Sequence, residues 1–569
     1  MSKVLFAIYR YACSGIFLII TIWLFLLSIF STSRMTTDAS EFTFYIGDYA
    51  WLHLIIFLII GIITYFLVKT EILSSLNMYF SRNYKAWLFV RNILLLVIGI
   101  IGTTWVLLTQ PHAGADQYYV LKAAHDLKTG DYSYFMKGGY ISKYTNQIGL
   151  LFIEYILGFI VGDYNYLFWQ LLNVVMVVFT FKLFSDILSI WKLPRLASLL
   201  CILMGILFFP WTLYSVFIYG TIAGLFFSLI AFKYTILYIQ DCKKNDSIHV
   251  SYIIISSLGM MLSVMVKSNY LIFMIALIIY TIAHAISLKN IKVILVTLAV
   301  IAGFCIQAVF PKMVIEKISG YSLNNGASSW TWIDMGLNTI NGNIYADGWY
   351  NYRIASLYEA NDCDPEAESL AAKAEIAQHL DNYKNNPSAF TLFLSRKIAS
   401  QWNNPGFQCF WITSVRSSSI KQSSIITNTL SENGQTVPLN YLNILQSVIL
   451  LGSLLYAIDA LFHNTFNAST ILPLTFIGGF IFHIFWEGKC QYTLPYFILL
   501  IPLCIMGFYN FSRHITDLSR NRLIKYGIAA AIGILITIIF NKFIILNYDN
   551  KSYASYHEYQ LNQGEQDEQ

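Results

Sequence analysis

Long apolar runs, separated by shorter polar stretches, extend over most of the chain. Most runs approach or reach the roughly 20 residues that a helix needs to cross about 30 Å of hydrocarbon. The pattern therefore predicts an all-α polytopic membrane protein with about 13 transmembrane helices. These predicted spans cover residues 13–32, 50–68, 88–109, 164–184, 196–216, 218–239, 251–266, 270–287, 292–310, 439–461, 469–486, 493–510 and 527–546.

A further apolar stretch, residues 148–162, is too short for a span and carries Glu154 near its middle. As a helix it would extend only about 22 Å. We expect it to lie flat at the outer surface as an interfacial helix. Counting it as a span would also move every later basic loop to the other side of the membrane.

The basic residues of the connecting loops support this register. With the N-terminus in the cytoplasm, the lysines and arginines of alternate loops fall on the cytoplasmic side, as the positive-inside rule requires. The first loop on the opposite side runs against this bias, because it contains Lys122, Lys128, Lys137 and Lys143. The basic residues expected inside are Lys69, Arg82, Lys85, Lys182, Lys192, Arg195, Lys243, Lys244, Lys289, Lys292, Arg513, Arg520, Arg522 and Lys525.

Two polar stretches are too long to be simple connections. Residues 110–163 would form a first external loop, and residues 311–438 are long enough for a small, mainly α extracytoplasmic domain. Within the second stretch, residues 365–383 and 389–402 have the pattern of helices. The expected organisation is two N-terminal spans with a cytoplasmic loop (1–87), a core (88–310), the loop domain (311–438), the C-terminal spans (439–546) and a disordered polar tail (547–569).

Composition agrees with a membrane protein and excludes several other classes. Apolar residues make up 57% of the chain and charged residues only 12%, whereas soluble domains carry about 25% charged residues. The net charge of +5 is spread over the loops, so no nucleic-acid partner is expected. The Lys/Asn/Ile-rich composition is typical of a bacterium of low genomic GC, which indicates a bacterial plasma membrane. Cys363 and Cys409 would form a disulfide in an exported loop or remain free thiols.

The first candidate chemistry follows the third apolar run, where Asp116 and Gln117 stand at the membrane edge. A carboxylate there can take a proton from an acceptor hydroxyl, although capping of the following helix is an alternative role. Tyr144, Asn146 and Gln147 precede the interfacial helix. The amide groups of Asn146 and Gln147 suit sugar hydroxyls or a phosphate, and helix capping is again the alternative.

Two further polar gaps interrupt apolar sequence. Lys267 lies between two spans, where a lysine at the membrane centre would cost roughly 3 kcal/mol. At an outer turn it would face a lipid phosphate, or it would only snorkel to the surface. Glu487, Lys489 and Tyr492 meet at an outer helix boundary, where the two charges either act in a site or neutralise each other.

In the long loop, cations and an aromatic residue come close together, a composition that favours an interface anchor. These residues are Arg396, Lys397, Trp402 and Pro405. No sequence motif of a P-loop, a zinc protease, a paired CxxC or a serine-hydrolase elbow is present. Because no cytoplasmic domain offers a nucleotide-sugar site, an activated sugar would have to arrive through the membrane.

The order of these motifs resembles the GT-C superfamily of polytopic glycosyltransferases, such as protein O-mannosyltransferases and aminoarabinose transferases. Asp116-Gln117, followed by a helix and Gly130, is similar to the acidic motif of that family's first external loop. The segment 144–147 resembles its entry to a juxtamembrane helix, with Thr145 where a proline is common. The segment 487–495 is similar to a late Glu…Arg-Tyr…Pro element, with Gln491 in place of the arginine. The resemblance covers about residues 88–510.

This resemblance implies an enzyme that takes a sugar from a polyprenyl-phosphate donor and passes it to a glycan or protein acceptor. Asp116 would be the general base, and Lys267 or Lys489 would stabilise the leaving phosphate. No cofactor is certain; some relatives use a divalent cation such as Mg or Mn, but no clear second carboxylate is present to hold one. A polysaccharide polymerase or ligase and a transporter or flippase of lipid-linked glycans remain alternatives.

Overall fold

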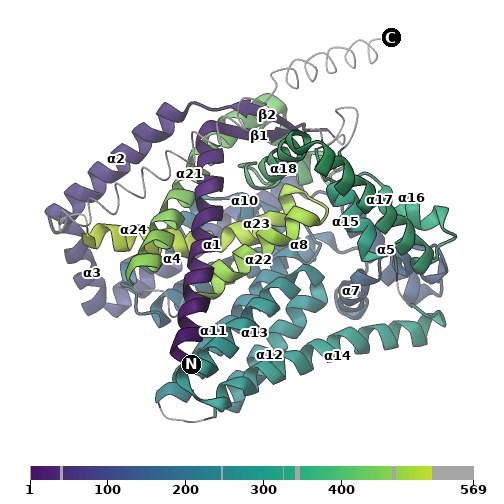
Figure 1. Cartoon of the computed structure of the whole chain (residues 1–569), viewed down its shortest axis with the longest axis horizontal. Coiled ribbons are helices and arrows are strands. Elements are labelled where there is room, and N and C mark those ends of the chain that lie inside the picture. The colour runs from purple at the N-terminus through teal and green to yellow at the C-terminus, as the bar shows by residue number, and fades with distance from the viewer. Residues whose placement is uncertain are drawn as a thin grey trace.

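The computed structural model describes residues 2–38, 41, 43–244, 248–323, 326–339, 346–463 and 470–514 of the 569-residue chain. Within this part, eight helices are long and apolar enough to cross a membrane, or up to eleven if each of three bent helix pairs is one span. This agrees with an all-α membrane protein (Figure 1). The eight are α1 (Ser2–Phe30), α2 (Ala50–Lys69), α4 (Tyr84–Thr109), α8 (Tyr166–Ile190), α11 (Thr221–Lys244), α13 (Leu271–Leu288), α14 (Ile294–Ser319) and α21 (Glu432–His463).

The other predicted spans are shorter or bent. The helices α12 (Val250–Val266) and α22 (Ile471–Phe485) are apolar but short. The segment 195–216 bends by 61° between α9 (Arg195–Leu207) and Pro210, whose ring favours the start of a new helix. The helices α23 (Cys490–Ile498) and α24 (Leu500–His514) meet at 42°. Because the predicted span 527–546 and the polar tail lie outside the described residues, the count of thirteen stays a prediction.

The predicted interfacial helix is α7 (Ile148–Val161). It turns by 95° from the helical segment 133–143 that precedes it, a bend that suits an interfacial helix or a re-entrant loop. The helix packs against α12, α14 and α5 (Asp116–Thr129), and its Glu154 is buried. Its position relative to the membrane surface stays a prediction.

The segment 311–438 is mainly helical. The two helices predicted there are confirmed as α17 (Pro365–Asn385) and α18 (Pro387–Trp402). Each begins with a proline after a capping side chain, Asp364 or Asn386, which accepts a backbone N–H bond. Figure 1 shows α15, α16 and α17 grouped beside α5 at one side of the molecule. The remaining helices of this segment are α15 (Ser329–Leu337), α16 (Arg353–Ala360), α19 (Trp411–Ser414) and α20 (Ser424–Leu430).

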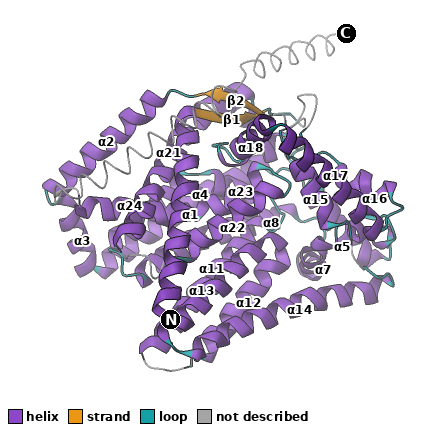
Figure 2. Cartoon of the chain, in the orientation of Figure 1, coloured by secondary structure: helices purple, strands orange, loops and turns teal. Residues whose placement is uncertain are grey.

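A two-stranded antiparallel hairpin connects α1 to α2, and the sequence pattern did not predict it. Strand β1 (Ser31–Met35) pairs with β2 (Thr43–Gly47), drawn in orange in Figure 2. The hairpin is bonded to the end of α18, because Ser33 donates to the carbonyls of Asn403 and Ala399 at 3.0 and 2.8 Å. The N-terminal segment is therefore joined to the 311–438 segment.

Two further predictions meet the structure here. The disulfide between Cys363 and Cys409 does not form, since both are free thiols. The interface-anchor hypothesis is wrong for Lys397 and Trp402, which are 0% and 1% exposed, and for the buried Pro405. Arg396 is half-buried. Lys397 donates to the carbonyls of Gly336, Ile484 and Trp486, the last two at 2.9 and 2.8 Å. Because the three N–H groups of this ammonium bond to carbonyls inside the protein, it does not reach the membrane surface.

Candidate functional site

A cavity of about 970 Å³ lies where several helix ends meet. Its walls come from the start of α5, the 140–147 segment, the junction of α12 with α13, the junction of α22 with α23, and the 311–438 segment. All nine candidate site residues line it, although they are spread over more than 370 positions of the chain. They are Asp116, Gln117, Tyr144, Asn146, Gln147, Lys267, Glu487, Lys489 and Tyr492.

Asp116 is the first residue of α5, and two tyrosine hydroxyls bond to its carboxylate. Tyr140 donates to Oδ1 at 2.8 Å, and Tyr219 donates to Oδ2 at 3.3 Å. The N-cap position belongs to Ala115 instead, so the capping role considered for Asp116 is wrong. The tyrosines hold the carboxylate at the cavity wall, where an incoming hydroxyl can reach it.

Two glutamines of the site, Gln117 and Gln147, are engaged by protein groups. The side-chain oxygen of Gln117 accepts the backbone N–H of Ile218 at 2.9 Å, and Gln147 donates to the Tyr219 hydroxyl. Gln147 makes no cap bond at the start of α7, so the capping alternative is wrong for it. These amides position the Tyr219 segment against Asp116. Fewer of their hydrogen-bonding groups are therefore left for a sugar or a phosphate.

Lys267 follows the last residue of α12, and its ammonium faces the cavity. Nζ lies 4.1 Å from the centroid of the Tyr219 ring and 3.5 Å from the Tyr219 carbonyl oxygen. Among the described residues, no carboxylate lies within 4.0 Å of it. Burial lowers the pKa of Lys267 to about 8, although the negative charges of Asp116 and Glu487 act in the opposite direction. The ammonium is therefore charged at neutral pH and available to an anion.

Two glycines allow the chain to place Lys267 here. Gly149 on α7 and Gly220 before α11 touch the last turn of α12 so closely that a Cβ would collide with the carbonyls of Met265 and Val266. Gly220 also has φ +72°, a conformation that side chains disfavour. Backbone can thus pack directly on backbone beside the lysine.

The junction of α22 and α23 contributes a second cation, Lys489. One alternative drawn from the sequence was that Lys489 and Glu487 only neutralise each other, but Lys489 has a different partner. Lys489 bonds to Glu41 at 2.5 Å, not to Glu487. The Glu487 carboxylate accepts the hydroxyl of Tyr492 at 3.3 Å. Burial raises the pKa of Glu487 to about 7, although the Lys489 ammonium lowers it. Burial opposes the charge of Lys489, but Glu41 and Glu487 outweigh it and hold its pKa above the usual value.

Several residues of the cavity were not predicted. Glu41 comes from the N-terminal hairpin region, and Tyr140 and Tyr219 bond to Asp116. Arg416 packs on Gly114, where a Cβ would collide with its guanidinium. Tyr140 lies just before the 144–147 segment that was identified from the sequence. Its aromatic ring and hydroxyl in this polar segment could have indicated that it belongs to the site. Nothing in the local sequence indicates Glu41 or Arg416.

The cavity does not fit the divalent cation that the family resemblance allows. No three His, Cys, Asp or Glu side chains come together as a metal site within the described residues. A catalytic divalent ion is normally held by several oxygen ligands at once. We therefore derive no step through a metal.

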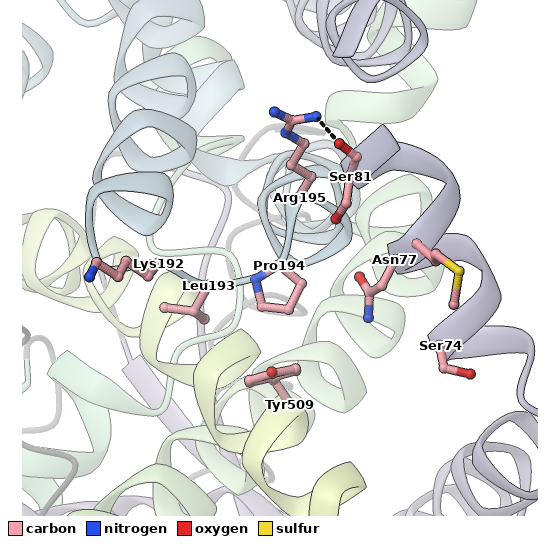
Figure 3. A pocket seen from close by; sticks show the side chains of 9 residues that line it. Ser74, Asn77, Ser81, Lys192, Leu193, Pro194, Arg195 and Tyr509 are labelled. Carbon is pink, nitrogen blue, oxygen red and sulfur yellow. Dashed lines mark hydrogen bonds between the residues drawn. The ribbon is translucent and has the colours of Figure 1, made fainter. Parts of the chain in front are cut away.

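A second, shallower cavity of about 550 Å³ lies among α3 (Ile72–Arg82), the start of α9 and α24. Its arginine, Arg195, is already engaged, because it donates to the carbonyls of Phe80 and Ser81 at the end of α3. Figure 3 shows the Lys192 side chain extending away from Asn77 and Ser74. No candidate site residue lines this cavity.

Comparison with protein-family models, with curated proteins and with solved structures finds no match to this chain. The geometry of the larger cavity therefore carries the functional argument. It joins a hydrogen-bonded carboxylate, a lysine without a carboxylate partner among the described residues, and an apolar side formed by Phe217, Leu271 and Ile272.

Proposed function

We propose that this protein is a GT-C-type membrane glycosyltransferase. It transfers a sugar from a polyprenyl-phosphate donor to an extracytoplasmic acceptor, which is a cell-envelope glycan, a lipid-linked glycan or a protein. The observation that carries the proposal is one cavity among apolar helices that holds Asp116 together with the Lys267 ammonium. A base for a hydroxyl and a cation for a phosphate are the two groups that this reaction requires.

The donor would use both chemical parts of this cavity. Its polyprenyl tail would lie in the bilayer and enter beside Leu271 and Ile272 at the start of α13. Its phosphate would meet the ammonium of Lys267, with Lys489 nearby on the α22–α23 junction. The proposed orientation places the N-terminus in the cytoplasm, the cavity outside, and about 13 spans in a bacterial plasma membrane.

The reaction is a direct displacement. The acceptor hydroxyl oxygen attacks the anomeric carbon, and Asp116 takes the hydroxyl proton as the new C–O bond forms. The bond from the anomeric carbon to the phosphate oxygen breaks, and its electron pair leaves with the lipid phosphate. Lys267 stabilises that charge, and the configuration at the anomeric carbon inverts. A positioned base typically contributes a factor of about 10² to 10⁴ in rate.

Reconstitution with radiolabelled polyprenyl-phosphate sugars tests this function. Wild-type protein in liposomes should move label from the lipid to a water-soluble or envelope acceptor and release polyprenyl phosphate. Asp116→Asn should lose about a thousandfold in transfer while its thermal midpoint stays the same, since an amide oxygen still accepts from Tyr140. Tyr140→Phe should keep most activity. Full transfer activity in Asp116→Asn would show that Asp116 is not the general base.

The same assay separates the alternatives. A polymerase or ligase would move a whole oligosaccharide from its lipid, and a flippase would carry the lipid-linked glycan across the membrane with no bond broken. Either outcome would replace the transferase proposal.

Cysteine labelling tests the orientation. Leu370 on α17 is 71% exposed, so Leu370→Cys should react with an impermeant maleimide on intact cells. The background should lack the exposed Cys305 and the half-buried Cys363. Labelling that requires cell lysis would place the loop domain, and with it the cavity, on the cytoplasmic side.

A further inference from the structure

Six aromatic side chains follow one another along the wall of the larger cavity. We call them the aromatic row: Tyr119, Tyr140, Tyr144, Trp332, Trp486 and Phe482. They come from α5, the 140–144 segment, α15, and the end of α22, so four separate parts of the chain build one continuous surface.

Neighbouring rings of the aromatic row touch. The centroids of Tyr119 and Tyr140 are 4.9 Å apart, as are those of Tyr140 and Tyr144. The centroids of Tyr144 and Trp332 are 6.3 Å apart. Trp332 in turn stacks on Trp486, with centroids 5.8 Å apart and an interplanar angle of 14°. These contacts are in the range of favourable aromatic pairs and fix the rings before any ligand binds.

The aromatic row passes directly beside the proposed base. The Tyr140 hydroxyl donates to Asp116 at 2.8 Å, and Glu487 follows Trp486 in the chain and lines the same cavity. Tyr119, the neighbour of Tyr140 at the end of the row, is 40% exposed, so the row opens to the protein exterior close to Asp116. The surface thus combines flat apolar rings with hydroxyl and carboxylate groups along one edge.

Carbohydrates match this combination. A pyranose ring presents C–H groups on its faces and hydroxyls around its rim, so it packs on an aromatic ring while carboxylates and tyrosine hydroxyls bond to the rim. A polyprenyl chain has no hydroxyls to bond to these polar groups and would remove water from their charges. A single-stranded nucleic acid requires a groove of uniformly positive charge, whereas the carboxylates of Glu41, Asp116 and Glu487 line this cavity among its cations. A peptide is recognised by strand or groove contacts, and the row consists of rings.

We propose that the acceptor is a carbohydrate chain of several sugar units, held along the aromatic row with one hydroxyl at Asp116. This inference rests on the proposed function for the transfer step, but the binding of the chain does not depend on transfer. Among the acceptors named above, this inference selects a glycan over a protein, because a protein or a single sugar unit would not contact six rings.

Direct binding tests the proposal. Wild-type protein in nanodiscs is titrated by isothermal calorimetry with linear hexaoses of glucose, mannose, galactose, N-acetylglucosamine and rhamnose, and with the matching disaccharides. At least one hexaose should bind saturably and at least about tenfold more tightly than its disaccharide, because a longer chain covers more rings. Trp332→Leu should weaken this binding about tenfold or more, and Trp332→Phe should retain most of it.

The same helix provides a matched control. Trp330 is two residues earlier on α15, is 42% exposed, and does not line the cavity. Trp330→Leu should leave hexaose binding unchanged. Absence of saturable binding to all five hexaoses would overturn the proposal, as would an equal loss in Trp330→Leu. Saturable binding of an unglycosylated Ser/Thr-rich peptide that Trp332→Leu abolishes would overturn it too.

Asp116→Asn separates this inference from the proposed function. The variant should lose transfer and keep hexaose binding. If wild-type protein binds hexaoses but transfers nothing, the enzymatic proposal fails and the glycan site stands. If it transfers sugar to a peptide without binding any hexaose, the acceptor inference fails and the transferase stands.

Discussion

The protonation of Lys267 provides a sharp test of the donor site. Its ammonium lies in the cavity over the Tyr219 ring, and burial lowers its pKa to about 8. A lysine is charged below its pKa and neutral above it. The sugar-bearing lipid phosphate is a diester, which stays singly negative through neutral and mildly alkaline pH. Donor binding should therefore weaken as pH rises through about 8.

The magnitude follows from the charged fraction. With a pKa of about 8, roughly nine tenths of the Lys267 side chains are charged at pH 7 and roughly one tenth at pH 9. We expect kcat/KM for the donor to fall about tenfold over this interval. An arginine stays charged throughout, so Lys267→Arg should flatten the alkaline side of the profile whatever its activity at pH 7.

Glu487 is the group to control for in this experiment. Burial raises its pKa to about 7, so it gains negative charge over a neighbouring pH range and would also repel a phosphate. The profiles are therefore measured in wild type, Glu487→Gln, and Glu487→Gln with Lys267→Arg, using initial rates at limiting donor. Parallel alkaline falls in the last two variants would refute the assignment of the phosphate to Lys267.

Three further predictions concern the cavity and the packing around it. Glu41→Gln removes the carboxylate from Lys489 and should lower the donor KM about threefold; an unchanged KM would contradict a phosphate near this lysine. Lys397→Met leaves three carbonyls without a donor and should reduce the free energy of unfolding by about 3 kcal/mol, seen as a lower denaturation midpoint in detergent. Gly149→Ala forces α7 away from α12 and should raise the donor KM about tenfold, whereas Gly99→Ala, which meets only an ordinary contact, should not.

The sequence by itself determined the membrane class and the candidate polar positions. Lipid excludes unpaired polar groups, so a lysine or carboxylate at the boundary of an apolar run is visible without a structure. Lys267 and Glu487 were found in this way, and both line the cavity. The helices α17 and α18 were also predictable, because proline and capping residues act within one turn.

Only the tertiary structure decided which helix ends meet. Glu41 and Lys489 are 448 residues apart, and no periodic pattern encodes such a pair. The local surroundings of Lys397 suggested a surface, but long-range packing made it the donor for three buried carbonyls. The aromatic row also depends on tertiary structure. Hydrophobic periodicity indicates which face of a helix is apolar, but it does not indicate which rings of other segments will contact that face. Local patterns measure solvent preference, whereas a site depends on the contacts between distant segments.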